Sequence, residues 1–227
     1  MAEQLGFDLP SVSALGRADF MVAPSNAMAV ALIENWQDWP NRKLVLSGPA
    51  GSGKTHLTQV WAALSNAQVV AASALSDADI PDLARAPVAV EDVPDLKDDL
   101  AGQTALFHLH NLVLAEGHAL LLTGTGTSAH WPLTLPDLVS RVAGTQSVAL
   151  DAPDDTLLTA VLAKLFADRQ IIVKPELLSY LTRRIDRSFA SARDVVAQLD
   201  AASLAQKRPL TRALAAAVLD KSRSTAR

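Results

Sequence analysis

The sequence contains the stretch Gly48-Pro49-Ala50-Gly51-Ser52-Gly53-Lys54-Thr55, which follows the apolar run Leu44-Val45-Leu46. An apolar segment comes next, with Leu57, Val60 and Trp61 spaced for one face of a helix. A buried strand, a G-x-x-x-x-G-K-[ST] loop and a helix, in that order, are what a phosphate-binding P-loop requires. The glycines let the backbone curl until successive N–H groups point at one anion. We therefore predict a nucleotide site at this loop.

Each polar residue type in the loop suits a task in nucleotide binding. Lys54 would reach the β- and γ-phosphates as a point charge, and Thr55 would place its hydroxyl on Mg²⁺. The helix that starts near Gly53 would add its positive N-terminal end. A glycine-rich turn that matches by chance is the alternative. It is rare when the whole motif and both flanking segments agree.

Composition and length describe a globular protein with a substantial core. The chain has 227 residues, of which 49% are hydrophobic and 19% charged, and it has no cysteine, so disulfides and thiolate metal sites are excluded. This length suits one large domain or a medium domain with a smaller one. There is no membrane-length apolar run and no basic-then-apolar N-terminus. We expect a cytoplasmic protein that does not bind membranes.

Charge is unevenly distributed along the chain. Residues 1–150 carry 7 Lys and Arg against 15 Asp and Glu, whereas residues 151–227 carry 13 against 9. An acidic main body argues against a broad DNA-binding face there. The modestly basic second part could touch a phosphate backbone, but a solvated helical surface explains it equally well. We expect contact with DNA to be indirect or weak.

A second strand-end motif follows the P-loop. The segment Pro87-Val88-Ala89-Val90 is apolar and leads into Glu91 and Asp92. In P-loop ATPases such a strand delivers one carboxylate toward the Mg²⁺ shell and a second that polarises water. Glu91 occupies the metal position and Asp92 the water position. Glutamate in place of the usual aspartate should shift the Mg²⁺ contact, which puts intrinsic hydrolysis in doubt more than binding.

A hydroxyl at the end of a later strand could complete this site. The apolar residues 118–122 run into Thr123-Gly124-Thr125, and a threonine there would lie between the acids and the γ-phosphate. Thr123 is our first choice, although the sequence does not rank it against Thr125, and a turn that uses Gly and Thr for backbone reasons is the alternative. His108 and His110 lie two residues apart on a predicted helix, so they point to different faces and predict no metal site.

Hydrophobic periodicity divides the chain into two folded parts. Residues 13–152 read as alternating strands and helices, whereas from Pro153 the pattern is helical only, with Leu158, Leu162 and Phe166 on one face. We predict an α/β domain over 13–152, an all-α domain over 153–227, and a flexible peptide over 1–12. The expected strands lie at 44–46, 68–71, 87–93, 118–122 and 147–150, and the expected helices of the first domain lie at 27–36, 54–64, 76–84, 103–116 and 135–142.

The first ten residues carry a short motif of their own. Gln4, Leu5, Phe7 and Leu9 resemble the Q-L-x-[LF]-x-L peptides with which bacterial replication proteins dock on the sliding clamp. Apolar side chains would fill a groove on the partner while the glutamine contacts its edge. Such a short pattern is weak alone, and an apolar chain terminus explains it too.

The whole pattern resembles the AAA+ ATPases and, within them, the DnaA family, above all its short Hda-type members. The resemblance spans about Asp19 to Leu204. It is carried by the boxes Gly53-Lys54-Thr55-His56-Leu57, Phe107-His108 with Asn111, Leu121-Leu122-Thr123, Leu138-Val139-Ser140-Arg141 and Ser191-Ala192-Arg193-Asp194. It implies a P-loop domain with a five-stranded parallel sheet flanked by helices, followed by a small helical lid.

The resemblance also assigns residues and partners. Arg141 would be an arginine finger that acts on a neighbouring subunit, and Arg193 a sensor that reaches from the lid to the nucleotide. The full nucleotide set would be Gly48, Pro49, Ala50, Gly51, Ser52, Gly53, Lys54, Thr55, His56 and Arg193, with ADP or ATP and Mg²⁺ as ligands.

About twenty residues follow the sensor helix, so we expect no helix-turn-helix DNA reader of the DnaA type. Hda-type proteins bind the DNA-loaded sliding clamp, the β subunit of DNA polymerase III, and promote hydrolysis of ATP on DnaA. The same role is implied here, with weak or no ATPase activity of the chain alone.

Two other functions stay open at this point. The chain could be an ATPase in its own right, of the helicase-loader or transposition-helper type, which the intact Lys54-Thr55 pair favours. It could also be a non-catalytic DnaA-family adaptor with an incidental N-terminal peptide. The sequence does not decide between a monomer and a homodimer, nor between ADP and ATP.

Overall fold

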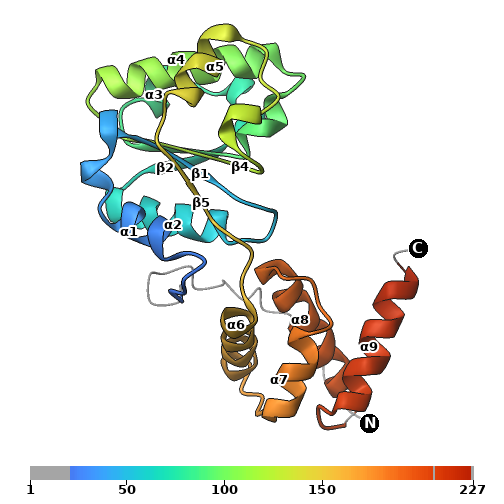
Figure 1. Cartoon of the computed structure of the whole chain (residues 1–227). Coiled ribbons are helices and arrows are strands. Elements are labelled where there is room, and N and C mark those ends of the chain that lie inside the picture. Colours follow the sequence, from blue (N-terminus) through green and yellow to red (C-terminus); the bar gives the residue numbers. More distant parts are fainter. Residues whose placement is uncertain (1–20, 207, 226–227) are drawn as a thin grey trace, which may run out of the picture.

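The computed structural model describes residues 21–206 and 208–225. The predicted clamp peptide, with Gln4, Leu5, Phe7 and Leu9, lies outside the described residues. The described chain forms an α/β body joined by one segment to a group of four helices (Figure 1). No helix in this part of the chain is long and apolar enough to span a membrane.

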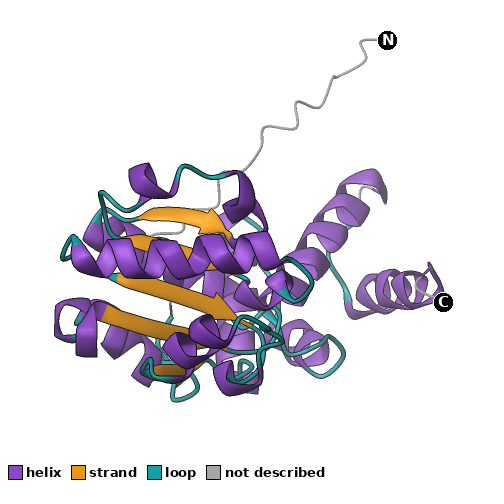
Figure 2. Ribbon diagram, turned by 90° about the horizontal axis from the view of Figure 1, so that it is seen from above, coloured by secondary structure: helices purple, strands orange, loops and turns teal. Residues whose placement is uncertain are grey.

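A five-stranded parallel sheet forms the centre of the α/β body, as the sequence predicts. The strand order is β2-β3-β4-β1-β5, and β1 lies between β4 and β5. The connections from β1 to β2 and from β4 to β5 therefore pass over intervening strands. Figure 2 shows the strands side by side beneath a helical layer. Their carboxyl ends meet at one edge, where ligands bind in sheets of this kind. The strands are β1 (Lys43–Ser47), β2 (Gln68–Ala71), β3 (Val88–Glu91), β4 (Leu120–Gly124) and β5 (Ser147–Ala149).

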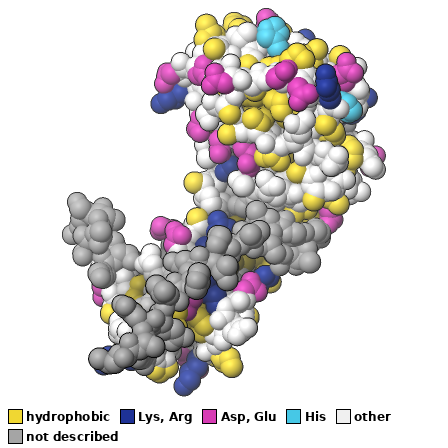
Figure 3. Space-filling view, turned by 180° about the vertical axis from the view of Figure 1, so that it is seen from behind, with side chains coloured by type: hydrophobic (Ala, Val, Ile, Leu, Met, Phe, Trp, Pro, Cys, Tyr) yellow, Lys and Arg dark blue, Asp and Glu magenta, His cyan; other side chains and the backbone are white. Residues whose placement is uncertain are grey.

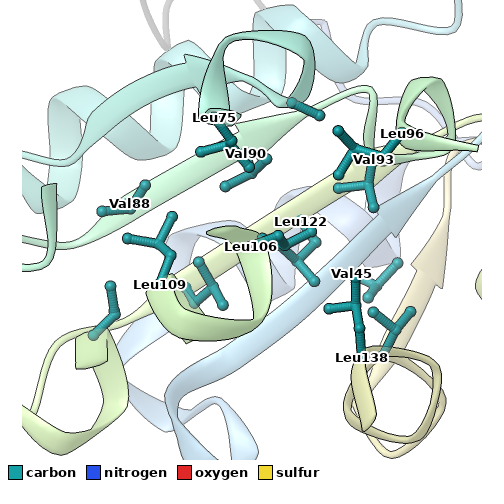
Figure 4. Packing of buried hydrophobic residues seen from close by; sticks show 14 of the residues in the cluster. Val45, Leu75, Val88, Val90, Val93, Leu96, Leu106, Leu109, Leu122 and Leu138 are labelled. Carbon is teal, nitrogen blue, oxygen red and sulfur yellow. The ribbon is translucent and has the colours of Figure 1, made fainter. Parts of the chain in front are cut away.

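Helices cover both faces of the sheet because the central strands are apolar on both sides. Val45, Val90 and Leu122 point to one face, where they pack against Leu106 and Leu109 (Figure 4). Alternate residues of the same strands, such as Leu46 and Leu121, pack on the other face. The first face is covered by α3 (Ile80–Leu83), α4 (Leu100–Ala115) and α5 (Pro136–Ala143), and the second by α1 (Ala27–Glu34) and α2 (Lys54–Ser65).

Helix α2 connects the P-loop to the core. Gly53 precedes it in the left-handed region at φ 100°, and Asn66 ends it in the same region at φ 56°. Its buried side is anchored by Trp61, whose ring stacks on Trp39 at 5.3 Å between centroids. The start of α2 is therefore held against the sheet by packing along its length.

The second helical group has a core of its own. Its helices are α6 (Asp155–Asp168), α7 (Pro175–Thr182), α8 (Phe189–Gln206) and α9 (Arg212–Thr225). Leu158, Leu162 and Phe166 of the predicted apolar face are all fully buried in this core. The Asp154 carboxylate caps α6 by accepting a hydrogen bond from the Leu157 amide at 2.7 Å.

One predicted element differs in the structure. The sequence predicts a helix over 76–84, but a 3-10 helix covers Ala72–Asp77 and a separate short α3 begins at Ile80. Pro81 has no N–H to donate to the carbonyl of Asp77, four residues back, so a continuous helix would leave that carbonyl unpaired. Asp79 instead starts α3 by accepting a hydrogen bond from the Asp82 amide at 3.1 Å.

Candidate nucleotide-binding site

The P-loop lies at the carboxyl edge of the sheet, directly after β1. Its first residue is tied to the neighbouring strand, because the Gly48 amide donates to the Gly124 carbonyl at 3.2 Å. Gly53, in the left-handed region, turns the chain into α2, so that the first amides of the helix face the loop. The local geometry is therefore that of a phosphate cradle.

Lys54 points into this cradle. Its side chain is only 7% exposed, and Nζ donates to the carbonyl oxygens of Gly48 and Pro49 at 2.9 and 3.0 Å. Burial lowers the pKa of Lys54, while the carboxylates of Asp92 and Glu91 oppose that shift. The ammonium group is thus held within the loop by backbone carbonyls, next to two acids.

Glu91 lies at the end of β3, facing α2. Burial raises the pKa of its carboxyl group, Asp92 adds to the shift, and the hydroxyls of Thr55 and Thr58 and the charge of Lys54 oppose it. The oxygen Oε1 is buried and has no hydrogen-bond partner. A buried acceptor without a partner is costly, and a cation beside it would remove that cost.

Thr123 and Thr125 differ clearly in their surroundings. Thr123 is 1% exposed, and its hydroxyl oxygen accepts a hydrogen bond from the Asp92 amide at 3.3 Å. Thr125 is exposed, and its carbonyl accepts from the Trp131 indole at 3.0 Å. Only Thr123 therefore joins the strand end that carries the acids.

The helical group contacts the P-loop through the start of α8. The Phe189 amide donates to the Gly51 carbonyl at 2.8 Å. Gly51 has φ 74°, and a Cβ atom there would lie 2.6 Å from Cβ of Ser188, so only glycine allows this approach. Arg193 is exposed one turn further along α8. The sequence predicted a lid arginine but not this contact, which joins backbone atoms and leaves no residue-type signal.

Arg141 is not near these residues. It is exposed in the last turn of α5, and its carbonyl accepts hydrogen bonds from Lys43 Nζ at 3.4 Å and from the Thr145 hydroxyl at 2.8 Å. Lys43 begins β1, whereas the P-loop follows the other end of that strand. The structure therefore brings together Lys54, Thr55, Glu91, Asp92 and Thr123 at the carboxyl ends of the strands. It places Arg141 at the opposite end of the sheet, where β1 begins.

The residues of the loop fit the phosphates of a nucleotide together with Mg²⁺. The P-loop holds a left-handed glycine before the helix, a buried ammonium group and the half-buried His56, and the Ser52 hydroxyl is buried without a partner. The Thr55 hydroxyl and the Glu91 carboxylate are the hard oxygen donors that Mg²⁺ prefers. Among the described residues, no group of three or more His, Asp or Glu side chains forms a separate metal cluster.

Replacing Glu91 with Gln separates the charge of this side chain from its shape. We expect the Mg²⁺-dependent part of nucleotide affinity to fall by about tenfold, because the carboxylate would no longer attract the cation. The thermal midpoint without ligand should stay the same or rise, since a buried charge with an unpaired oxygen is removed. Titrations with Mg²⁺ and with EDTA, alongside an Asp95→Asn control, measure both effects. Equal affinities of variant and wild type in Mg²⁺ would contradict this role.

Sequence reasoning also missed a buried pair at the far edge of the sheet. His110 is 3% exposed, and its Nε2 atom lies 3.3 Å from Nζ of Lys43. Burial is the main reason that the pKa of His110 falls to about 4; the charges of Lys43 and Arg141 act in the same direction, and the hydrogen bond that Nδ1 donates to Asn111 opposes them. The sequence signal was present, because residues 106, 109, 110 and 113 share one face of α4. The partner of His110 on β1 could not be predicted from the sequence.

This low pKa predicts a pH dependence of stability. The unfolded chain binds a proton at His110 near pH 6.5 and the folded chain only near pH 4, so stability falls as the pH drops through that window. The full loss is up to about 3 kcal/mol. Urea unfolding of wild type and His110→Gln at pH 7 and pH 4.5 measures it, with the exposed His108→Gln as control. An unchanged pH dependence in His110→Gln would contradict the assignment.

Comparison with known proteins identifies both parts of the fold. Residues 155–219 match the family model for the lid domain of Hda. The chain is similar to domain III of the replication initiation protein DnaA from Thermotoga maritima, with a TM-score of 0.77 and 18% identity over 91% of this chain and 96% of that one. The family match shows that α6 to α9 form a lid domain of the Hda type. The α/β body has the AAA+ fold that this likeness to DnaA domain III shows.

Two longer DnaA structures extend the comparison. DnaA from Aquifex aeolicus bound to AMPPCP matches with a TM-score of 0.69 and 15% identity over 80% of this chain. A replication initiator DnaA bound to AMPPCP and single-stranded DNA matches with a TM-score of 0.69 and 17% identity over 81%. The Hda-like chain spans 63% of the length of each. At these identities the likeness shows the fold, and the nucleotide and DNA belong to those proteins.

Proposed function

We propose that this Hda-like protein is a negative regulator of replication initiation, which presents Arg141 to ATP bound on DnaA and promotes its hydrolysis. The supporting observation is the position of Arg141. It is exposed at the edge of the sheet where β1 begins, about 16 Å from the chain's own P-loop, the length of a five-residue strand. An arginine side chain cannot span that distance, so its charge is available to a neighbouring subunit.

The chemistry asked of Arg141 is electrostatic. Negative charge redistributes over the phosphoryl oxygens when the terminal phosphate of ATP is transferred to water. A guanidinium group fixed beside those oxygens stabilises the transition state more than the ground state, and arginine fingers of this kind change rates by orders of magnitude. The chain contributes this one charge, and the partner contributes the ATP and its water.

The chain's own P-loop would hold ADP or ATP in a supporting role. Lys54 and the loop amides would bind the phosphates, Thr55 and Glu91 the Mg²⁺ ion, and Arg193 would approach from the lid. Bound nucleotide supplies anionic phosphates that neutralise these cations. Asp92 and Thr123 would hold the water, but the longer side chain of Glu91 would shift the Mg²⁺ contact, so we infer weak turnover by the chain alone.

The N-terminal peptide would tether the regulator to the DNA-loaded sliding clamp, with Gln4, Leu5, Phe7 and Leu9 in the clamp groove. Direct contact with DNA is then not needed. The surface of the AAA+ domain agrees with this, because Asp and Glu side chains are spread over the face shown in Figure 3. An acidic surface of this kind repels a phosphate backbone.

The test is the fate of radiolabelled ATP prebound to DnaA and incubated with the protein, with and without clamp loaded on DNA. We expect conversion to ADP that depends on the clamp and disappears when Gln4 and Leu5 are both replaced by Ala. Conversion that is the same without the clamp, or without these two side chains, would show that the N-terminal peptide does not tether the protein to the clamp. No conversion would overturn the regulatory function, and ATP turnover by the chain alone, stimulated by single-stranded DNA, would then favour a stand-alone ATPase.

A further inference from the structure

Lys43 is an unusual residue for the first position of a core strand. Its side chain is 8% exposed and lies on the sheet face that α4 and α5 cover. No carboxylate of the described residues forms an ion pair with it. Burial lowers its pKa, and the positive charge of Arg141 lowers it further. An apolar side chain of similar length would cost less to bury, so stability alone does not explain a lysine here.

The two contacts of Lys43 join different helices. Nζ donates to Nε2 of His110 on α4 at 3.3 Å and to the backbone carbonyl of Arg141 on α5 at 3.4 Å. The other ring nitrogen of His110 lies 3.3 Å from Oδ1 of Asn111, which assigns its proton to Nδ1 and leaves Nε2 to accept from the lysine. The low pKa of His110 keeps the ring neutral at physiological pH, so it stays an acceptor.

The carbonyl of Arg141 therefore receives two side-chain hydrogen bonds, one from Lys43 on the sheet and one from the Thr145 hydroxyl at 2.8 Å. These bonds fix the last turn of α5, where a helix has carbonyls without intrahelical partners. The ammonium group also repels the nearby guanidinium group, because the two charges interact. That repulsion disfavours a side chain folded back over the sheet edge and directs Arg141 toward solvent.

We propose that Lys43 is a positioning residue for Arg141, with His110 holding the lysine in place. Lys43 touches neither nucleotide. It acts through its hydrogen bond to the backbone of α5 and through repulsion of the guanidinium group. The Arg141 side chain is thus already oriented before it reaches the partner's phosphates. This proposal rests on the proposed function, because it concerns the same arginine.

Replacing Lys43 with Met tests the proposal, since methionine fills similar space without donating a hydrogen bond. We expect the maximal rate of DnaA-bound ATP hydrolysis to fall by about tenfold at saturating protein, with the half-saturating concentration unchanged within about twofold. Affinity for nucleotide at the chain's own P-loop should not change. Arg42→Met is the matched control, because Arg42 lies at the same edge but donates to the Leu114 carbonyl on α4.

A loss of packing alone would give different results. It would lower the thermal midpoint and raise the half-saturating concentration, and the rate would reach the wild-type maximum at higher protein concentration. That result would overturn the proposal. A Lys43→Met variant with the wild-type maximal rate would overturn it as well.

Hydrogen exchange gives a readout that does not depend on DnaA. We expect faster exchange in residues 139–145 of Lys43→Met and unchanged exchange in residues 48–58. If the wild type itself fails to stimulate DnaA, the proposed function fails. Unchanged exchange over residues 139–145 would then show separately that Lys43 does not position α5.

Discussion

Replacing Arg141 with Ala is expected to slow the stimulated hydrolysis of DnaA-bound ATP by about 100-fold or more. The reason is that one fixed positive charge beside the transferred phosphoryl group would be lost. The fold should persist, because the side chain is exposed and forms no ion pair with any described residue. The rate is measured in single turnover with labelled ATP on DnaA and the variant in excess.

The control for this variant is Arg85→Ala, which removes another exposed arginine of the α/β body, one that pairs with the exposed Asp82. It should leave stimulation unchanged. If Arg141→Ala unfolds the protein, the assignment of an exposed finger is wrong. If it folds and stimulates at the wild-type rate, the charge that drives hydrolysis lies elsewhere.

Replacing Lys54 with Ala is expected to weaken nucleotide binding by the protein by about 100-fold or more, about 2.7 kcal/mol. The ammonium group is the only side-chain cation inside the described P-loop, and the loop carbonyls of Gly48 and Pro49 hold it there. The unliganded fold should be retained, because alanine is a good helix former at the start of α2 and the change removes a buried charge. Isothermal titration with ADP and with ATP, each with Mg²⁺, gives the affinities.

The exposed Lys97→Ala serves as the charge-matched control and should bind like wild type. Affinity of Lys54→Ala within about threefold of wild type would exclude the P-loop as the nucleotide site. The same variant distinguishes the role of the P-loop from the role of Arg141. If the chain's own nucleotide only supports the fold, Lys54→Ala at saturating concentration should keep part of its stimulation, whereas Arg141→Ala should keep none.

The grouping of residues around the P-loop was largely predictable from the sequence, because these residues are contiguous or end a strand. Lys54 and Thr55 belong to one motif, and Glu91 and Thr123 each follow an apolar run whose carboxyl end must meet the P-loop in a parallel sheet. The choice between Thr123 and Thr125 needed the structure. Their side chains differ in burial and in contact with Asp92, which no local pattern encodes.

The cluster of Lys43, His110 and Arg141 at the other end of the sheet could not be predicted in the same way. Lys43 is the first residue of the P-loop strand and resembles a surface charge in the sequence, and His110 resembles one of two unrelated histidines on a helix. The contacts of Lys43 with His110 and with the Arg141 carbonyl depend on β1 lying between β4 and β5 and on α4 and α5 covering the same face. Such neighbours are separated by 67 and 98 residues in the chain. Tertiary packing, rather than periodicity, brings them together.

We propose that the protein acts on a nucleotide held by another molecule. The most direct measurement places labelled ATP on one partner at a time, with unlabelled nucleotide on the other, and follows phosphate release in a single turnover. We expect fast release when the label is on DnaA and slow release when it is on this protein. Fast release only from label prebound to this protein would contradict it and would identify the chain as an ATPase in its own right.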